Sequence, residues 1–270
     1  MPELPEVETT RRGIEPFVQG QIITAVHIRQ AQLRWVIPPE IQELAGQTVT
    51  HLTRRGKYIL LHTAKGTALI HLGMSGSLRI VDATLEARKH DHFDLLLADG
   101  KAVRYYDPRR FGALLWTTTD PQQHALLRDL GPEPLSDDFS GEHLFQRSRS
   151  RKISVKAFIM NAHIVVGVGN IYANEALFLA GIDPRRAAGR VAHERFLKLA
   201  ECIREVLTYA IERGGTTLRD FVREDGSPGY FQLELKVYDR RDQPCTVCQT
   251  PIRQITQGQR STWFCPCCQR

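Results

Sequence analysis

Four cysteines near the end of the chain place the strongest constraint on its fold. They form two Cys-x-x-Cys pairs, Cys245 with Cys248 and Cys265 with Cys268, and sixteen residues separate the pairs. This spacing is typical of a site in which four thiolates bind one zinc ion. Because four thiolates complete a tetrahedral shell, the ion is expected to be structural and to take no part in chemistry. The sequence therefore predicts a small zinc-stapled hairpin at the end of the chain.

Two further cysteines leave alternatives to this ligand set. Cys267 is an alternative fourth ligand, although the x-x spacing favours Cys268. Cys202 falls in a helical pattern and is expected in the core. Disulfides are disfavoured, because charged residues among the first twenty argue against a signal peptide and a cytoplasmic chain keeps its thiols reduced. No hydrophobic segment approaches membrane-spanning length.

The start of the chain, Met-Pro-Glu-Leu-Pro-Glu-Val-Glu, is the second informative stretch. A methionine before a residue as small as proline is expected to be trimmed, which leaves Pro2 with a secondary amine. Such an amine gives an iminium ion with an aldehyde-level carbon, and Glu3 and Glu6 are close enough in sequence to move the protons. The alternative is a helix entrance with Pro5 at the first helical position. Both interpretations can hold, because a helix that starts at Pro5 would fix the amine in front of it.

The charge of the chain favours a polyanionic partner. Its 270 residues include 36 Lys and Arg against 30 Asp and Glu, a formal net charge of +6. The basic residues are grouped, most densely at 147–152. The hydrophobic content of 42% agrees with a folded protein that has a substantial core.

The pattern of short apolar segments predicts sheet first and helices afterwards. Many short strands with Gly and Asp turns between them indicate an antiparallel sandwich or barrel. The Gly-Pro-Glu-Pro stretch at 131–134 is the expected domain boundary, and helical periodicity follows it. The predicted strands are 22–28, 49–54, 58–62, 68–72, 77–81, 93–98, 102–106 and 113–116, and the predicted helices are 150–160, 171–180 and 196–214.

Two loops have compositions that suit a function. The segment 167–170, Gly-Val-Gly-Asn, precedes a predicted helix, so its N–H groups are suited to an anion, with Asn170 as the helix cap or a phosphate donor. A dinucleotide-binding loop is disfavoured because the G-x-G-x-x-G pattern and a β-α-β context are missing, and a plain tight turn is the other alternative. The Gly/Pro-rich segment 223–232 is expected to move as a lid.

Seven ordered segments run through the whole chain: 2–8, 55–58, 71–76, 107–112, 167–175, 225–231 and the cysteine hairpin. Together they resemble the formamidopyrimidine-DNA glycosylases, bacterial repair enzymes that excise oxidised purines and then nick the DNA. The resemblance implies an α+β multidomain chain with a β-sandwich at 1–132, a helix-two-turn-helix domain at 133–234 and a zinc finger at 235–270. It also implies a cytoplasmic monomer that binds double-stranded DNA containing 8-oxoguanine, formamidopyrimidines or abasic sites.

The resemblance also assigns roles to single residues. Pro2 becomes the Schiff-base nucleophile at the sugar C1′, and Glu3 the acid that helps to open the sugar. Lys57 and Arg260 become proton donors or phosphate clamps in the β- and δ-eliminations, where a fixed cation stabilises each departing phosphate.

Further residues match the positions with which the family holds distorted DNA. Met74, Arg109 and Phe111 match a wedge that fills the hole left by the everted base, although core packing is an alternative for Met74 and Phe111. The chain departs from many relatives at Ser227 in the lid and at His163, where those relatives have lysine. The other residues implied to bind DNA are Glu6, His71, His90, Arg151, Lys156, Asn170 and Tyr238.

Two other functions compete with this interpretation. The sister family of endonuclease VIII removes oxidised pyrimidines with the same terminal proline, but Leu4 and a wedge split between Met74 and Arg109/Phe111 favour the purine enzymes. A non-catalytic zinc module would explain the charge and the cysteines, but it has no use for a Pro-Glu terminus or a lid.

Overall fold

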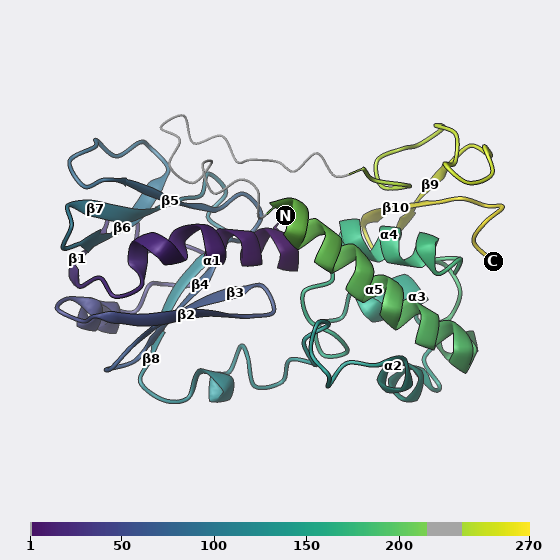
Figure 1. Cartoon of the computed structure of the whole chain (residues 1–270), viewed down its shortest axis with the longest axis horizontal. Coiled ribbons are helices and arrows are strands. Elements are labelled where there is room, and N and C mark those ends of the chain that lie inside the picture. The colour runs from purple at the N-terminus through teal and green to yellow at the C-terminus, as the bar shows by residue number, and fades with distance from the viewer. Residues whose placement is uncertain (1, 215–233) are drawn as a thin grey trace. The chain divides into compact units, whose positions relative to one another are not determined.

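A computed structural model describes residues 2–214 and 234–270 (Figure 1). The described chain divides into two compact units, one of residues 2–128 and 211–214 and the other of residues 129–210 and 234–270. The whole of the expected lid at 223–232, including Ser227, lies outside the described residues. The predicted domain limits at 132 and 234 stay predictions.

Eight strands of the first unit form two antiparallel four-stranded sheets, in the orders β1-β6-β7-β5 and β2-β3-β4-β8. Inward-facing side chains of both sheets belong to one hydrophobic core, with Phe93 and Leu95 from one sheet and Ile59 and Leu61 from the other. The sandwich is therefore confirmed over the barrel. The strands are β1 (Ile23–Ile28), β2 (Val49–Arg55), β3 (Tyr58–Thr63), β4 (Thr67–His71), β5 (Ser77–Asp82), β6 (Asp91–Leu97), β7 (Lys101–Tyr106) and β8 (Ala113–Thr117).

Helix α1 (Leu4–Val18) contacts β2 and β3 of one sheet and β5 of the other. It buries Leu4, Val7 and Ile14. The helix begins one residue earlier than predicted, so Pro5 takes its second position rather than its first. The reason is that Glu3 acts as the N-cap, and its N–H donates to the Glu6 carboxylate over 2.8 Å. Two short 3₁₀ helices, Pro39–Leu44 and Pro121–Gln123, complete the unit.

The second unit is a helical domain with its own apolar core. Helix α2 was not predicted, although Ser140 marks its start by accepting the N–H of His143. The predicted helix 150–160 is wrong in its first half, because Ser150 has a φ of 62° and Ser154 caps a shorter helix. The elements are α2 (Gly141–Ser148), α3 (Val155–Ile159), α4 (Asn170–Leu179), the 3₁₀ turn Ala188–Arg190 and α5 (His193–Gly214).

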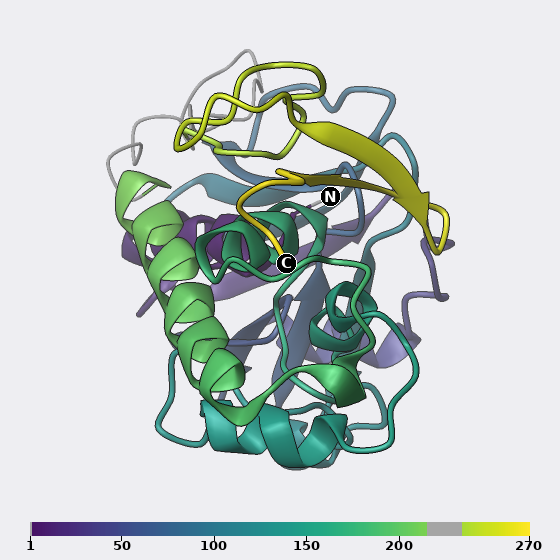
Figure 2. The ribbon, with the colours of Figure 1, turned by 90° about the vertical axis from the view of Figure 1, so that its right-hand side faces the viewer.

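The chain ends in the predicted hairpin, formed by β9 (Arg253–Gln257) and β10 (Arg260–Phe264). Gly258 and Gln259 at its tip both have positive φ, the conformation that two-residue hairpin turns favour. Strand β10 packs against α4 (Figure 2). Within the described residues, no helix is long and apolar enough to cross a membrane.

Candidate active site and zinc centre

Pro2 lies directly in front of a helix whose N-cap, Glu3, is held firmly. Glu3 is only 2% exposed, its carbonyl accepts the N–H of Val7, and its own N–H is bound by Glu6. Pro2 itself is half-buried. The start of α1 therefore determines the position of Pro2, the predicted nucleophile. Glu6 contributes to the position of Pro2 indirectly, because its carboxylate accepts the N–H of the peptide bond between Pro2 and Glu3.

Lys57 occupies the tight turn between β2 and β3, and one arginine joins this turn to α1. The Arg54 guanidinium donates to the carbonyl of Gly56 over 2.8 Å and to the Glu8 carboxylate over 3.2 Å. Burial alone would raise the pKa of Glu8, but hydrogen bonds from Arg11 and Arg12 hold it below the ordinary value. The ionised Glu8 carboxylate, through Arg54, therefore holds the turn that bears Lys57 against α1.

His71 at the end of β4 is a neutral imidazole. Burial, followed by the charges of Lys57 and Arg34, lowers its pKa to about 4. The N–H of Gly73 donates to Nδ1 over 2.9 Å, so the ring proton lies on Nε2. His71 is therefore available as an uncharged donor to a phosphate oxygen.

The three predicted wedge residues are exposed at the surface of the first unit. Met74 and Phe111 have exposed fractions of 40% and 45%, so the core-packing alternative is wrong for both. The Arg109 guanidinium lies 5.0 Å from the centre of the Phe111 ring, in a cation–π contact. His90 lies in the same unit, with its ring edge-on to Tyr106 at 5.9 Å.

Asn170 is the first residue of α4 and not its cap. The cap is Gly169, and the Asn170 side chain instead donates to the carbonyl of Ser261 over 3.1 Å. The prediction of an N-cap was wrong because the hairpin 91 residues later supplies an acceptor that no local pattern reveals. Asn170 therefore lies beside the residue that follows Arg260, at the exposed start of β10.

Lys156 is buried, with an exposed fraction of only 2%. Its ammonium donates to the carbonyl of Ser261 over 2.9 Å and to the hydroxyl of Thr262 over 2.7 Å. It thus joins α3 to the hairpin instead of presenting its charge at the surface. Arg151 is exposed, and Tyr238 packs its ring 4.4 Å from that of Trp263.

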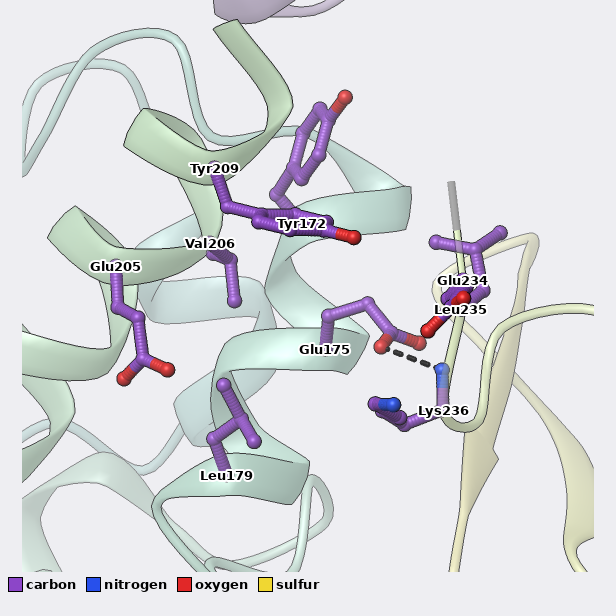
Figure 3. A pocket seen from close by; sticks show the side chains of 9 residues that line it. All are labelled: Tyr172, Glu175, Leu179, Glu205, Val206, Tyr209, Glu234, Leu235 and Lys236. Atoms are coloured by element: carbon purple, nitrogen blue, oxygen red, sulfur yellow. Dashed lines mark hydrogen bonds between the residues drawn. The ribbon is translucent and has the colours of Figure 1, made fainter. Parts of the chain in front are cut away.

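Glu175 was missed by the sequence reasoning, although it is the one charged residue of α4. Its carboxylate accepts three successive backbone N–H groups, those of Lys236, Val237 and Tyr238, over 2.8 to 2.9 Å. Figure 3 shows the side chain reaching from α4 to the chain segment that leads to the hairpin, across a cavity of about 330 Å³. Glu175 therefore fixes both the hairpin and Tyr238 to the helical core.

The four predicted ligands come together at the base of the hairpin. The sulfur atoms of Cys245, Cys248, Cys265 and Cys268 all lie within 4.8 Å of one another. The Cys245–Cys268 and Cys248–Cys265 separations are 3.9 and 3.4 Å, close to the ~3.8 Å edge of a tetrahedron with zinc–sulfur bonds of about 2.3 Å. Cys267 is exposed and outside the cluster, so the choice of Cys268 is confirmed. The donor set fits one structural zinc ion.

Hydrogen bonds around the sulfur atoms also suit thiolate ligands. The N–H of Val247 donates to the sulfur of Cys245, and that of Cys268 to the sulfur of Cys265. The hydroxyl and N–H of Thr250 lower the pKa of Cys248 to about 6, whereas burial raises the pKa of Cys265 and of Cys268, an effect that the charge of a bound zinc ion would offset. His163, the other position that departs from many relatives, binds the carbonyl of Asp129 at the surface of the helical unit.

Three family models match the chain in order. They are the formamidopyrimidine-DNA glycosylase N-terminal domain over residues 1–114, the formamidopyrimidine-DNA glycosylase H2TH domain over 130–222, and a zinc finger found in FPG and IleRS over 242–270. The H2TH name supports the predicted helix-two-turn-helix domain. The order of the three matches is that of the sandwich, the helices and the hairpin.

Relatives and solved structures are similar over the full length. The formamidopyrimidine-DNA glycosylases of Pseudomonas savastanoi and Thioalkalivibrio sulfidiphilus are 58% and 56% identical, with all of each chain covered. The crystal structure of MutM (Fpg) from Thermus thermophilus has a TM-score of 0.86 at 38% identity and covers 99% of this chain and 98% of that one. Lactococcus lactis Fpg (MutM) in complex with Fapy-dG containing DNA has a TM-score of 0.89 at 32% identity, with coverage of 99% and 100%.

Proposed function

This chain belongs to the formamidopyrimidine-DNA glycosylase family, and we propose that it carries out the family's reaction through the secondary amine of Pro2. It is a bifunctional DNA glycosylase and abasic-site lyase of base excision repair that acts on oxidised purines. The observation that carries the proposal for Pro2 is the helix directly behind it. Because Glu3 is buried and its N–H is bound by Glu6, the terminal amine has a defined place at the surface of the sandwich.

The reaction needs a neutral amine and a nearby acid. The Pro2 nitrogen attacks C1′ of the damaged nucleotide, the bond to the base breaks with its electron pair leaving on the base, and the proton that the amine loses passes to the departing base. Glu3 donates a proton to the sugar oxygen as the ring opens, which leaves an iminium ion between C1′ and Pro2. Loss of a proton from C2′ then expels the 3′ phosphate, and a second elimination expels the 5′ phosphate. Lys57 and Arg260 stabilise the negative charge on these leaving groups.

Eversion of the damaged nucleotide leaves a gap in the duplex that Met74, Arg109 and Phe111 fill. Their exposure supports this role, since large apolar side chains at a surface are suited to insertion between bases. The Arg109 guanidinium offers donors to the base that has lost its partner, and the Phe111 ring beneath it offers a stacking surface.

The remaining residues hold the DNA backbone or position those that do. His71 acts as a neutral donor, and His90, Arg151, Asn170 and Tyr238 contact phosphates. Two residues predicted to bind DNA act through others: Glu6 through the N–H of Glu3, and Lys156 through Ser261 and Thr262.

We expect 8-oxoguanine opposite cytosine and ring-opened purines as substrates, since the Lactococcus lactis protein has been solved with Fapy-dG containing DNA and with an abasic site. The net charge of +6 supports an electrostatic contribution to binding of the duplex. We place the protein in the bacterial cytoplasm as a monomer.

Borohydride reduction in the presence of duplex DNA with 8-oxoguanine opposite cytosine tests the nucleophile. Reduction of the iminium is expected to give a stable covalent adduct with the wild-type protein. An N-terminal extension, which moves the free terminal amine away from residue 2, is expected to abolish it, and Pro2→Gly, which leaves a primary amine, is expected to reduce it. An adduct that persists undiminished in both would assign the nucleophile elsewhere, and no adduct with the wild type would favour a module that only binds DNA.

A further inference from the structure

Two neighbouring loops carry the chain of the first unit from one sheet to the other. Residues 72–76 join β4 to β5, and residues 107–112 join β7 to β8. The first loop bears Met74, and the second bears Arg109 and Phe111. The proposed wedge is therefore divided between two separate crossovers, and something must set the distance between its halves.

The two crossovers lie backbone against backbone. A Cβ atom on Gly73 would lie 2.5 Å from the nitrogen of Gly112, and one on Gly112 would lie 1.7 Å from the hydroxyl of Tyr105. Only glycine allows this approach, and Gly73 also has a φ of +66°.

The carboxylate of Asp107 connects these loops from inside. Asp107 has no exposed surface, and its Oδ1 accepts the Ser75 hydroxyl of the first loop over 2.7 Å. The same oxygen accepts the N–H of Arg109 over 3.2 Å. Its Oδ2 accepts the N–H of Gly112 over 2.9 Å and the hydroxyl of Tyr105 over 3.1 Å. Four donors from two loops and one strand thus converge on one buried group.

This arrangement requires a carboxylate. Burial, and then the charge of Asp107, raise the pKa of Tyr105, so its hydroxyl stays protonated and remains a donor. An asparagine in place of Asp107 would offer one acceptor oxygen and would turn an N–H₂ group toward two of the four donors. Buried donors that lose their acceptor are costly, so the loops would rearrange.

We infer that Asp107 is a positioning residue for the wedge, which holds the Met74 loop and the Arg109–Phe111 loop at the spacing needed to enter one gap in the duplex. The inference rests on the proposed function, because it gives a role only to a wedge that inserts into DNA. It predicts that Asp107 matters when the wedge has to contact a base opposite the lesion, and that it does not matter for the covalent chemistry of Pro2.

Two duplexes with the same abasic strand separate these contributions. In one, cytosine lies opposite the abasic site; in the other, an abasic analogue lies there, so the wedge has no opposite base to contact. We expect Asp107→Asn to slow single-turnover strand cleavage about tenfold to a hundredfold on the first duplex and less than about threefold on the second. Ser75→Ala removes one of the four donors and tests the inference if Asp107→Asn does not fold. It should show the same pattern, with cleavage of the first duplex slowed about fivefold.

The matched control is Asp82→Asn, which alters an exposed carboxylate that accepts from Thr84 in its own turn. It should cleave both duplexes at the wild-type rate. Equal losses on the two duplexes by folded Asp107→Asn and Ser75→Ala proteins, or no loss on either, would overturn the inference. Failure of the wild type to form a borohydride adduct with either duplex would instead overturn the proposed function of Pro2.

Discussion

His71 illustrates how one residue can couple stability to pH. Its folded pKa of about 4 lies below the value of about 6.5 for an unfolded chain. A depressed histidine pKa contributes fully above the unfolded value, and its contribution is lost as the pH falls from about 6.5 toward about 4. We expect the free energy of unfolding to fall by about 2 kcal/mol between neutral pH and about pH 5 through this group alone.

Chemical denaturation of the wild type and of His71→Gln at a series of pH values measures this contribution. Glu8 and Asp94, whose pKa values are lowered, also lose stabilising interactions on acidification, but both proteins share them. The wild type should therefore lose more stability than the variant over this interval. Parallel pH profiles would show that His71 accepts a proton in the folded state as easily as in the unfolded one.

Single residues also show where sequence reasoning reached its limit. The four zinc ligands were predicted from spacing alone, because a local pattern determines which sulfur atoms can meet. Lys156 and Glu175 bind groups more than 60 residues away, so no local pattern distinguishes their buried role from that of surface charges. Asp107 belongs to the segment 107–112 that carries the resemblance, but no role was predicted for it, because the loop that it binds begins more than 30 residues earlier.

At the scale of elements, the joint between α1 and the turn from β2 to β3 leads to a second prediction. Arg54→Ala should slow strand cleavage of abasic DNA about tenfold, because the turn that bears Lys57 loses its charged hydrogen bond at Gly56. The borohydride adduct should still form, since the capped start of α1 remains. Time courses of cleavage and of adduct formation on one substrate measure the two effects.

Arg12→Ala is the matched control for this joint. Arg12 also pairs with Glu8, at 2.7 Å, but its side chain is 51% exposed and extends from α1 itself. Its removal should leave cleavage within about twofold of the wild type, as expected for an exposed pair. If both variants slow cleavage equally, the charge around Glu8 matters and the support of the turn by Arg54 does not.

The elements themselves were predicted with unequal success, for physical reasons. The eight strands were located to within two residues, because apolar alternation and Gly or Asp turns define both their faces and their ends. Helix α2 spans only eight residues and carries too short an apolar pattern to be recognised. The start of α3 was misjudged because the left-handed backbone at Ser150 interrupts a run of residues that otherwise suits a helix.

For the whole molecule, we expect a zinc ion at the four cysteines to link the binding of DNA to the folding of the hairpin. Within the described residues, side-chain hydrogen bonds join this hairpin to the helical core, and they are made by Lys156, Asn174, Glu175 and Gln269. Without the metal, no ion bridges the four cysteine sulfur atoms, which lie within 4.8 Å of one another. The hairpin that carries Arg260 then lacks the cross-link that holds the two cysteine pairs together. Loss of zinc should thus affect capture of DNA before it affects chemistry at Pro2.

We therefore expect Cys245→Ser to weaken binding to duplex DNA about tenfold or more, and to lower the number of phosphate contacts measured from the salt dependence of the affinity. The rate of adduct formation at saturating DNA should change less, since Pro2 and Glu3 belong to the sandwich. Cys267→Ser is the matched control, because Cys267 lies between two of the ligands, Cys265 and Cys268, but outside the ligand set, and it should retain both zinc and affinity. A zinc-free Cys245→Ser protein with wild-type affinity would mean that docking onto α4 suffices to order the hairpin without its metal.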